Sequence, residues 1–128
     1  MSAPSLLLLI SDEGMSVSPS AQGVEIGVEI DQPTTRKTAS INGCNFVSVW
    51  FDTNILNITI RIDYSLDEGQ TWTPLISNVN PLSNNAQITM SRWRGIPQEA
   101  KTVATMFRAV AIGVVPATFH FIEIQFRG

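Results

Sequence analysis

Few side chains in this chain of 128 residues are of the types that carry out chemistry: there is one histidine, His120, and one cysteine, Cys44. A histidine acting as general base needs an acid to orient it, and one acting as metal ligand needs further ligands. His120 instead stands in an alternating apolar run, so we expect it to share a strand face with Ile122 and Ile124. Cys44 leads into a hydrophobic segment and is expected to be a small buried side chain, not a nucleophile with a neighbouring base.

Acidic residues are the next candidates, because paired carboxylates can hydrolyse glycosidic bonds and can bind calcium. Asp63, Asp67 and Glu68 are close in sequence, and Glu25 and Glu29 alternate on one expected strand face. The turn at residues 67–69 supplies two carboxylates, and the further acidic positions of a calcium-binding loop are missing. We expect these carboxylates to be solvated charges on outer strand faces, and we predict no enzymatic activity, no cofactor and no metal site.

Tryptophan and arginine occur together once, where Trp93 stands between Arg92 and Arg94. These residue types are enriched at binding hot spots. Three uses remain open: an indole tucked beneath a loop with both arginines in water, an anchor in a protein interface, or a contact to a sugar ring. We take all three residues as interface candidates. Trp50, within an apolar run, is expected in the core.

The elements that must position these residues are strands. Ile58, Ile60, Ile62 and Tyr64 alternate with polar residues, which is the period of a half-buried strand. Similar patterns and turn signals predict eight strands, at residues 5–10, 24–30, 45–51, 55–65, 70–76, 86–90, 102–112 and 118–127. Residues 98–102 are expected to hold a single helical turn at most, residues 11–23 a loop and residues 31–40 a polar connection. The pattern predicts one all-β domain, an antiparallel β-sandwich of about eight strands, of jelly-roll or immunoglobulin-like topology.

One turn carries a recognisable motif. The pattern S-x-D-x-G-x-T-W is matched at Ser65, Asp67, Gly69, Thr71 and Trp72, and it resembles the Asp-box of sialidases and related β-proteins. The resemblance implies a folded hairpin remote from any chemistry, with Asp67 facing solvent and Trp72 packed beneath the turn. The chain has one tyrosine and no internal repeat, so the tyrosine–glutamate pair and the bladed propeller of sialidases are not expected here.

Composition limits the possible partners. Hydrophobic residues make up 44% and charged residues only 15%, below the usual quarter, so we expect some apolar surface to be covered by another subunit. The net charge is −3 and the basic residues are scattered, which argues against nucleic-acid binding. A lone cysteine excludes an intramolecular disulfide and fits a protein made in the cytoplasm.

The apolar run at residues 6–10 lacks the basic flank of a signal peptide and is too short to span a bilayer. It is expected to be either a first strand or an arm that inserts into a neighbour, with residues 1–23 forming arm and loop and residues 24–128 the sandwich. The run completes the set of interface candidates: Leu6, Leu7, Leu8, Leu9 and Ile10.

Small size, low charge, an all-β pattern and the absence of a catalytic set together resemble the decoration (cement) proteins of tailed-bacteriophage capsids, which often form trimers at threefold positions. The resemblance implies a structural protein of the virion, made in the host cytoplasm and placed on the capsid surface. Its partners would be itself, as a homotrimer, and a major capsid protein, with no nucleic acid and no membrane. The alternative is a carbohydrate-binding module or receptor-binding tip that uses residues 92–94 as its platform.

Overall fold

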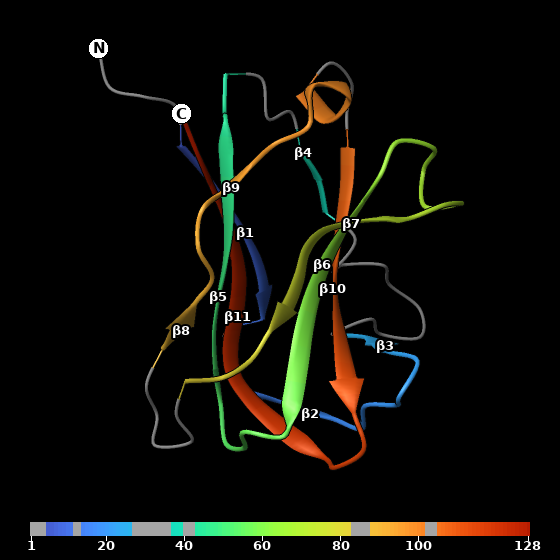
Figure 1. The fold of residues 1–128 in the computed structure, drawn as a ribbon, viewed down its shortest axis with the longest axis vertical. Helices are drawn as coiled ribbons and strands as arrows, with labels where there is room; N and C mark the ends of the chain where they lie inside the picture. The colour runs from blue at the N-terminus through green and yellow to red at the C-terminus, as the bar shows by residue number, and fades with distance from the viewer. Residues whose placement is uncertain (1–4, 12–13, 27–36, 40–42, 83–87, 102–104) are drawn as a thin grey trace.

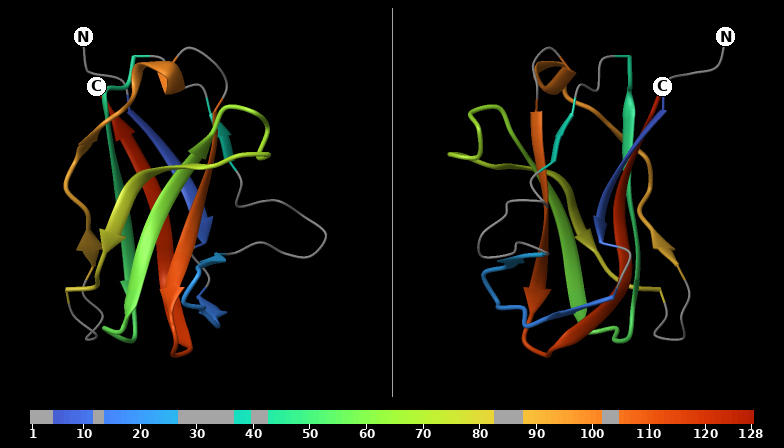
Figure 2. Two further views of the ribbon diagram at one scale, coloured as in Figure 1. Left: turned by 45° about the vertical axis from the view of Figure 1, so that its right-hand side comes forward. Right: turned by 180° about the vertical axis from the view of Figure 1, so that it is seen from behind.

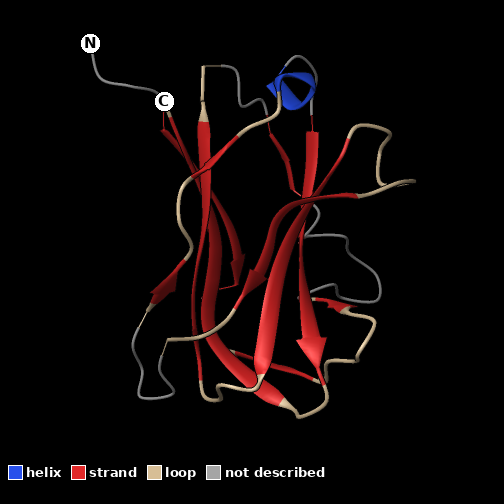
Figure 3. Cartoon of the chain, viewed as in Figure 1, coloured by secondary structure: helices blue, strands red, loops and turns tan. Residues whose placement is uncertain are grey.

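The computed structural model describes residues 5–11, 14–26, 37–39, 43–82, 88–101 and 105–128. Two antiparallel sheets lie face to face (Figures 1 and 2), which confirms the predicted β-sandwich. The described helical structure is one 3-10 turn, η1 (Gln98–Lys101), which agrees with the single helical turn expected at residues 98–102 (Figure 3). Among the described residues, no helix has the length and apolar character needed to cross a membrane.

The strands divide between the sheets as follows. The six-stranded sheet has the order β1 (Ser5–Ser11), β11 (Ala117–Arg127), β5 (Phe46–Thr53) and β8 (Thr89–Met90), with β2 (Met15–Val17) beside β11 and β9 (Arg94–Gly95) beside β5. The five-stranded sheet has the order β3 (Val24–Glu25), β10 (Thr105–Gly113), β6 (Ile58–Ser65) and β7 (Thr73–Val79), with β4 (Lys37–Ala39) beside β10.

The strand order is that of a jelly roll. With the short β2, β4 and β9 set aside, the remaining strands follow the order first, eighth, third, sixth in one sheet and second, seventh, fourth, fifth in the other. Among the described pairings of these strands, only β6 and β7 are neighbours both in the chain and in a sheet. This interleaving is produced by two Greek keys. In an immunoglobulin fold the first two strands would pair in one sheet, and here they lie in different sheets.

Each of the eight predicted strands overlaps an observed strand, and three short strands were not predicted. β2 lies in the expected loop at residues 11–23, β4 in the expected polar connection, and β9 between the strands predicted at residues 86–90 and 102–112. They have two or three residues, which is too short for an alternation to be visible. They form because they run beside β5, β10 and β11, whose backbone groups provide hydrogen-bond partners.

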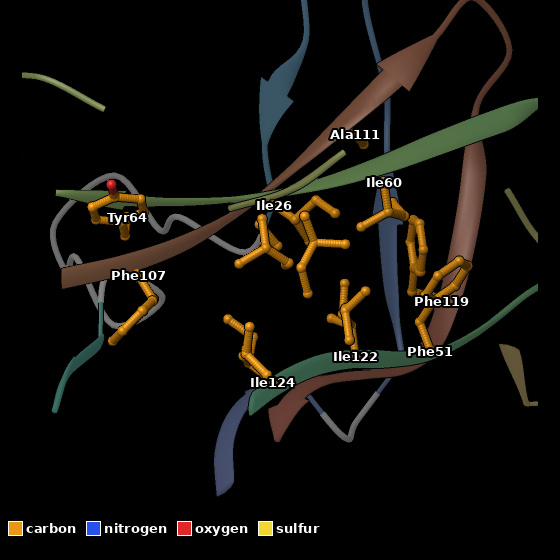
Figure 4. Close-up of a cluster of buried hydrophobic side chains, with 14 of the residues drawn as sticks. Ile26, Phe51, Ile60, Tyr64, Phe107, Ala111, Phe119, Ile122 and Ile124 are labelled. Atoms are coloured by element: carbon orange, nitrogen blue, oxygen red, sulfur yellow. The ribbon is translucent and has the colours of Figure 1, made fainter. Parts of the chain in front are cut away.

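The core lies between the sheets, where the apolar faces of β5, β6, β10 and β11 meet (Figure 4). Ile60 and Ile62 are fully buried, as the alternation in β6 predicted. Two tilted aromatic pairs bridge the strands: the ring centroids of Phe51 and Phe119 are 5.9 Å apart, and those of Phe107 and Phe126 are 4.9 Å apart. Phe107 and Phe126 come from opposite sheets, so this pair clamps the two layers together.

The predicted face of His120 is wrong. Ile122 and Ile124 are fully buried, whereas His120 is exposed and Phe119 is buried in its place. The pairing of β11 with β5 shifts register between Phe119 and Phe121. One extra residue at such a bulge exchanges the two faces of the strand, which an alternating sequence pattern does not reveal.

The predicted core position of Trp50 is also wrong. Val49 and Phe51 point into the core, so Trp50 points to the opposite side of β5, where it is half-buried beside Glu123 and Met90 of the neighbouring strands. An apolar run of consecutive residues cannot show which of its members faces inward, because a strand alternates faces whatever its composition.

Replacing Phe107 by alanine should lower the free energy of unfolding by about 3–5 kcal/mol, because it removes a fully buried ring from the contact between sheets. The control is Leu82→Ala, since Leu82 is 74% exposed and its replacement should cost about 1 kcal/mol or less. Denaturant unfolding of both variants measures the difference. Equal losses would contradict the described core.

Candidate functional site

The β6–β7 hairpin turn is closed by side chains. The Asp67 carboxylate accepts hydrogen bonds from the Ser65 hydroxyl at 2.7 Å, from the Thr71 backbone N–H at 2.9 Å, and from the Thr71 hydroxyl. The Ser65 oxygen in turn accepts from the Gly69 backbone N–H at 2.9 Å. The Thr71 hydroxyl, the Thr71 N–H and the Ser65 hydroxyl lower the pKa of Asp67 to about 2, because each donor favours its charged form. The turn is therefore a structural device, and its kinship with Asp-boxes stays a prediction.

A buried carboxylate lies next to this turn and holds two arginines. Asp63, only 1% exposed, accepts from Arg61 Nε and from Arg108 Nε, both at 2.8 Å. The Arg108 guanidinium also stacks over the Trp72 ring, 4.4 Å from its centroid. The expectation that Asp63 is solvated is therefore wrong: two guanidiniums replace its water, which makes burial of the charge tolerable. The cluster ties the hairpin to β10.

The arginines flanking Trp93 line a cleft. We call it the arginine cleft: a cavity of about 530 Å³ between β7 with the residues after it and the segment at residues 91–94. β7 and the β8–β9 segment are edges of different sheets on the same side of the sandwich (Figures 1 and 2). The lining comprises Ile76, Ser77, Asn78, Val79, Asn80, Ser91, Arg92, Trp93 and Arg94.

Two contacts fix the segment at residues 91–94. The Ser91 hydroxyl accepts from the Val49 backbone N–H at 3.0 Å and lies 3.1 Å from the Ser48 hydroxyl, so it is anchored to β5. The Trp93 ring is half-buried, and the Arg127 guanidinium stacks on it at 4.4 Å from the centroid. Trp93 is therefore held by the last residues of β11, while Arg92 and Arg94 are exposed.

The other interface candidates lie at the far edge of the same sheet. Leu6 and Leu8 pair with Phe126 and Ile124 of β11, so residues 6–10 are in the first strand of the chain's own sheet. Leu7 is 50% exposed on the outer side. Because the sheet runs β1-β11-β5-β8, the structure does not bring residues 6–10 and residues 92–94 together.

Between these edges is a surface that the sequence analysis did not identify, where apolar side chains stand among polar ones such as Glu123 and Gln125. We call it the outer sheet face, made of Leu7, Phe46, Trp50, Met90 and Phe121, which the strand registers place on the side away from the core. Two buried polar atoms on this side, Trp50 Nε1 and Asp52 Oδ1, have no hydrogen-bond partner among the residues that the structure describes. The alternation of Phe46 and Trp50 with Val47 and Val49 was the signal that could have located it.

Cys44 and Tyr64 lie in surroundings that disfavour their ionised forms. Cys44 is buried, and desolvation raises the pKa of its thiol, which disfavours the reactive thiolate. Tyr64 donates to Glu99 of η1 at 3.2 Å, and burial followed by the Glu99 carboxylate raises its pKa. In the described part of the chain, no group of three or more histidine, cysteine, aspartate or glutamate residues could hold a metal ion.

The strand order and closed core define the class of fold, a jelly-roll β-sandwich. No protein-family model matches the chain, and no curated protein is similar to it in sequence at a significant level. Solved structures are similar in fold: the VP2 subviral particle of infectious bursal disease virus has 11% identity and a TM-score of 0.56 over 97% of this chain. The T13 particle of the same virus has 10% identity and a TM-score of 0.55 over 98% of it.

The match to T=1 particles derived from that virus is equivalent, with 11% identity and a TM-score of 0.55 over 97% of this chain. The chain spans about a third of these proteins, since it covers 32% of the first and 31% of the other two. At this identity the likeness establishes the fold.

Asp67→Asn should flatten the acid limb of the stability profile. The pKa of Asp67 in the folded protein, about 2, is below its ordinary value of 3.8, so its contribution is complete above about pH 4 and is lost as the pH falls towards 2. Melting temperatures between pH 5 and pH 2 should fall more steeply in the wild type than in the variant. Glu68→Gln, which removes the adjacent exposed carboxylate, should keep the wild-type slope; parallel curves for Asp67→Asn and the wild type would refute the role of the turn.

Asp63→Ala should destabilise the protein by about 2–4 kcal/mol, because it leaves two partly buried guanidiniums without their counterion. The control is Glu123→Ala, which removes another strand carboxylate that accepts a hydrogen bond from Gln125, and this change should cost about 1 kcal/mol. Urea unfolding at neutral pH compares them. A loss at Asp63 no larger than at Glu123 would mean that the cluster does not tie the hairpin to β10.

Proposed function

We propose that the chain is a structural protein of a virus particle that acts by burying its surface against other subunits. The observation that carries this proposal is the agreement in fold with VP2 from viral particles across nearly the whole chain, at a TM-score of 0.56. Jelly rolls also occur in lectins and cupins, so the fold narrows the function without deciding it. The surface of this chain supplies the further support.

The outer sheet face is suited to an interface between subunits. Leu7, Phe46 and Met90 are 50%, 39% and 46% exposed on one side of one sheet, in a chain with only 15% charged residues. An exposed apolar patch on a sheet is stabilised when a partner excludes water from it.

Within this class, the proposed role is that of a capsid decoration (cement) protein of a tailed bacteriophage. The chain would form a homotrimer on the capsid surface and contact a major capsid protein. β1 and the segment at residues 92–94 bound the outer sheet face at its two edges, so the candidates from the sequence and this face can serve one extended surface. A standard interface buries about 1,600 Å², and repetition around a shell multiplies modest contact energies.

Sedimentation velocity of the purified chain tests the assembly. At tens of micromolar we expect the mass of three 14.0 kDa chains. Leu7→Glu combined with Met90→Glu places two charges on the outer sheet face and should give monomers. Leu66→Glu, at an equally exposed leucine of the β6–β7 turn, should leave the mass unchanged. A monomeric wild type would contradict the trimer, and a double variant of wild-type mass would exclude the outer sheet face as its interface.

A further inference from the structure

We propose that the arginine cleft binds a sugar acid, that is, a saccharide that carries a carboxylate. The proposal goes beyond the structural role: the cleft shares residues 92–94 with the proposed interface, and its ligand binding is measured separately from assembly.

The first argument is charge. Within the described part of the chain, neither the Arg92 nor the Arg94 guanidinium has an ion-pair or hydrogen-bond partner, and the residues lining the cleft include no carboxylate. The other described arginines are engaged: Arg61 and Arg108 hold Asp63, and Arg127 stacks on Trp93. Two neighbouring cations without a counterion, in a chain of net charge −3, favour an anionic ligand. A guanidinium matches a carboxylate with two parallel hydrogen bonds.

The second argument is the neutral lining. Asn80 Oδ1 accepts from the Thr59 hydroxyl at 2.9 Å, which orients the amide and leaves its N–H groups able to donate into the cleft. Ser77 and Asn78 add a hydroxyl and a second amide. The half-buried Val79 and Trp93 provide apolar surface. A sugar ring presents both hydroxyl groups and apolar faces, and a volume of about 530 Å³ is typical of small-ligand sites.

The third argument is rigidity. The Arg127 guanidinium on the Trp93 ring and the hydrogen bonds of Ser91 to β5 hold one wall of the cleft in place before a ligand arrives. A preformed wall reduces the ordering cost of binding. On the other wall, Asn78 has a φ of 56°, a left-handed conformation, at the point where β7 shifts register against β6.

The same wall argues against an extended acidic peptide as the occupant. A peptide would bind most strongly by adding a strand to the free edge of β7. Pro74 has no N–H to offer there, and the left-handed Asn78 interrupts the extended backbone near the end of the strand. Recognition is therefore left to side chains, which suits a compact ligand.

Isothermal titration of the full chain with glucuronic acid and N-acetylneuraminic acid tests the proposal, with glucose as the neutral counterpart and tetraglutamate as the acidic peptide. We expect at least one sugar acid to bind with a dissociation constant in the millimolar range or lower. Glucose should bind at least about tenfold more weakly than that sugar acid. Arg92→Gln combined with Arg94→Gln should lower the affinity for the sugar acid by about tenfold or more. Lys101→Gln removes a positive charge outside the cleft and should leave binding unchanged.

Four outcomes overturn the proposal: no binding of either sugar acid, equal binding of glucose, unchanged binding by the double arginine variant, or binding of tetraglutamate alone. The last outcome would assign the cleft to an acidic protein partner. Arg92→Lys combined with Arg94→Lys retains charge but not the planar fork and should show an intermediate affinity, which separates carboxylate recognition from general attraction. Sedimentation of the same variants shows whether assembly changes, so failure of this site and failure of the structural role remain distinguishable.

Discussion

The contact between the inner faces of the two sheets is the constraint on which the rest of the molecule depends. β5 and β11 in one sheet, and β6 and β10 in the other, present fully buried phenylalanine, isoleucine and valine side chains to each other. Without that contact, strands that are distant in sequence would have no reason to pair. Ser5 pairs with Arg127, so the pairing of the first and last strands closes a loop that contains almost the entire chain. The conformational entropy lost in closing that loop must be offset by the burial of apolar surface.

The few charges of the protein are used in distinct ways. Asp63 joins two arginines across β6 and β10, and Asp67 closes a turn with hydrogen bonds that favour its ionised form. Arg127 stacks on Trp93 and lies 5.4 Å from the Phe46 ring centroid, so its role is packing as well as charge. Arg92 and Arg94 differ, because no described residue neutralises them. In a chain so poor in charge, the two unpaired guanidiniums at a cleft are the clearest sign of a ligand.

The jelly roll leaves two kinds of surface available for function. One is the outer sheet face, where strand registers place apolar side chains on the side away from the core. The other is the open side of the sandwich, where the edges of different sheets approach without pairing and the arginine cleft is formed. The fold alone does not choose between particle assembly and ligand binding, because jelly rolls serve both. The two surfaces border each other at residues 92–94, so one protein can present both.

The amino-acid sequence by itself determined the local structure: strands from alternating residues such as Ile58, Ile60 and Ile62, a turn at residues 67–69, and a buried Cys44. Alternation and turn chemistry act over a few residues, so they can be recognised without knowing what a strand will pack against. Only the tertiary structure decided the strand order, the bulge that turns His120 outward, the outward side of Trp50, and the burial of Asp63 between two arginines. It also placed residues 92–94 beside β7 and residues 6–10 at the opposite edge of the sheet. Each of these depends on pairing between residues far apart in the chain, and the free energy of such contacts is not encoded in any single segment.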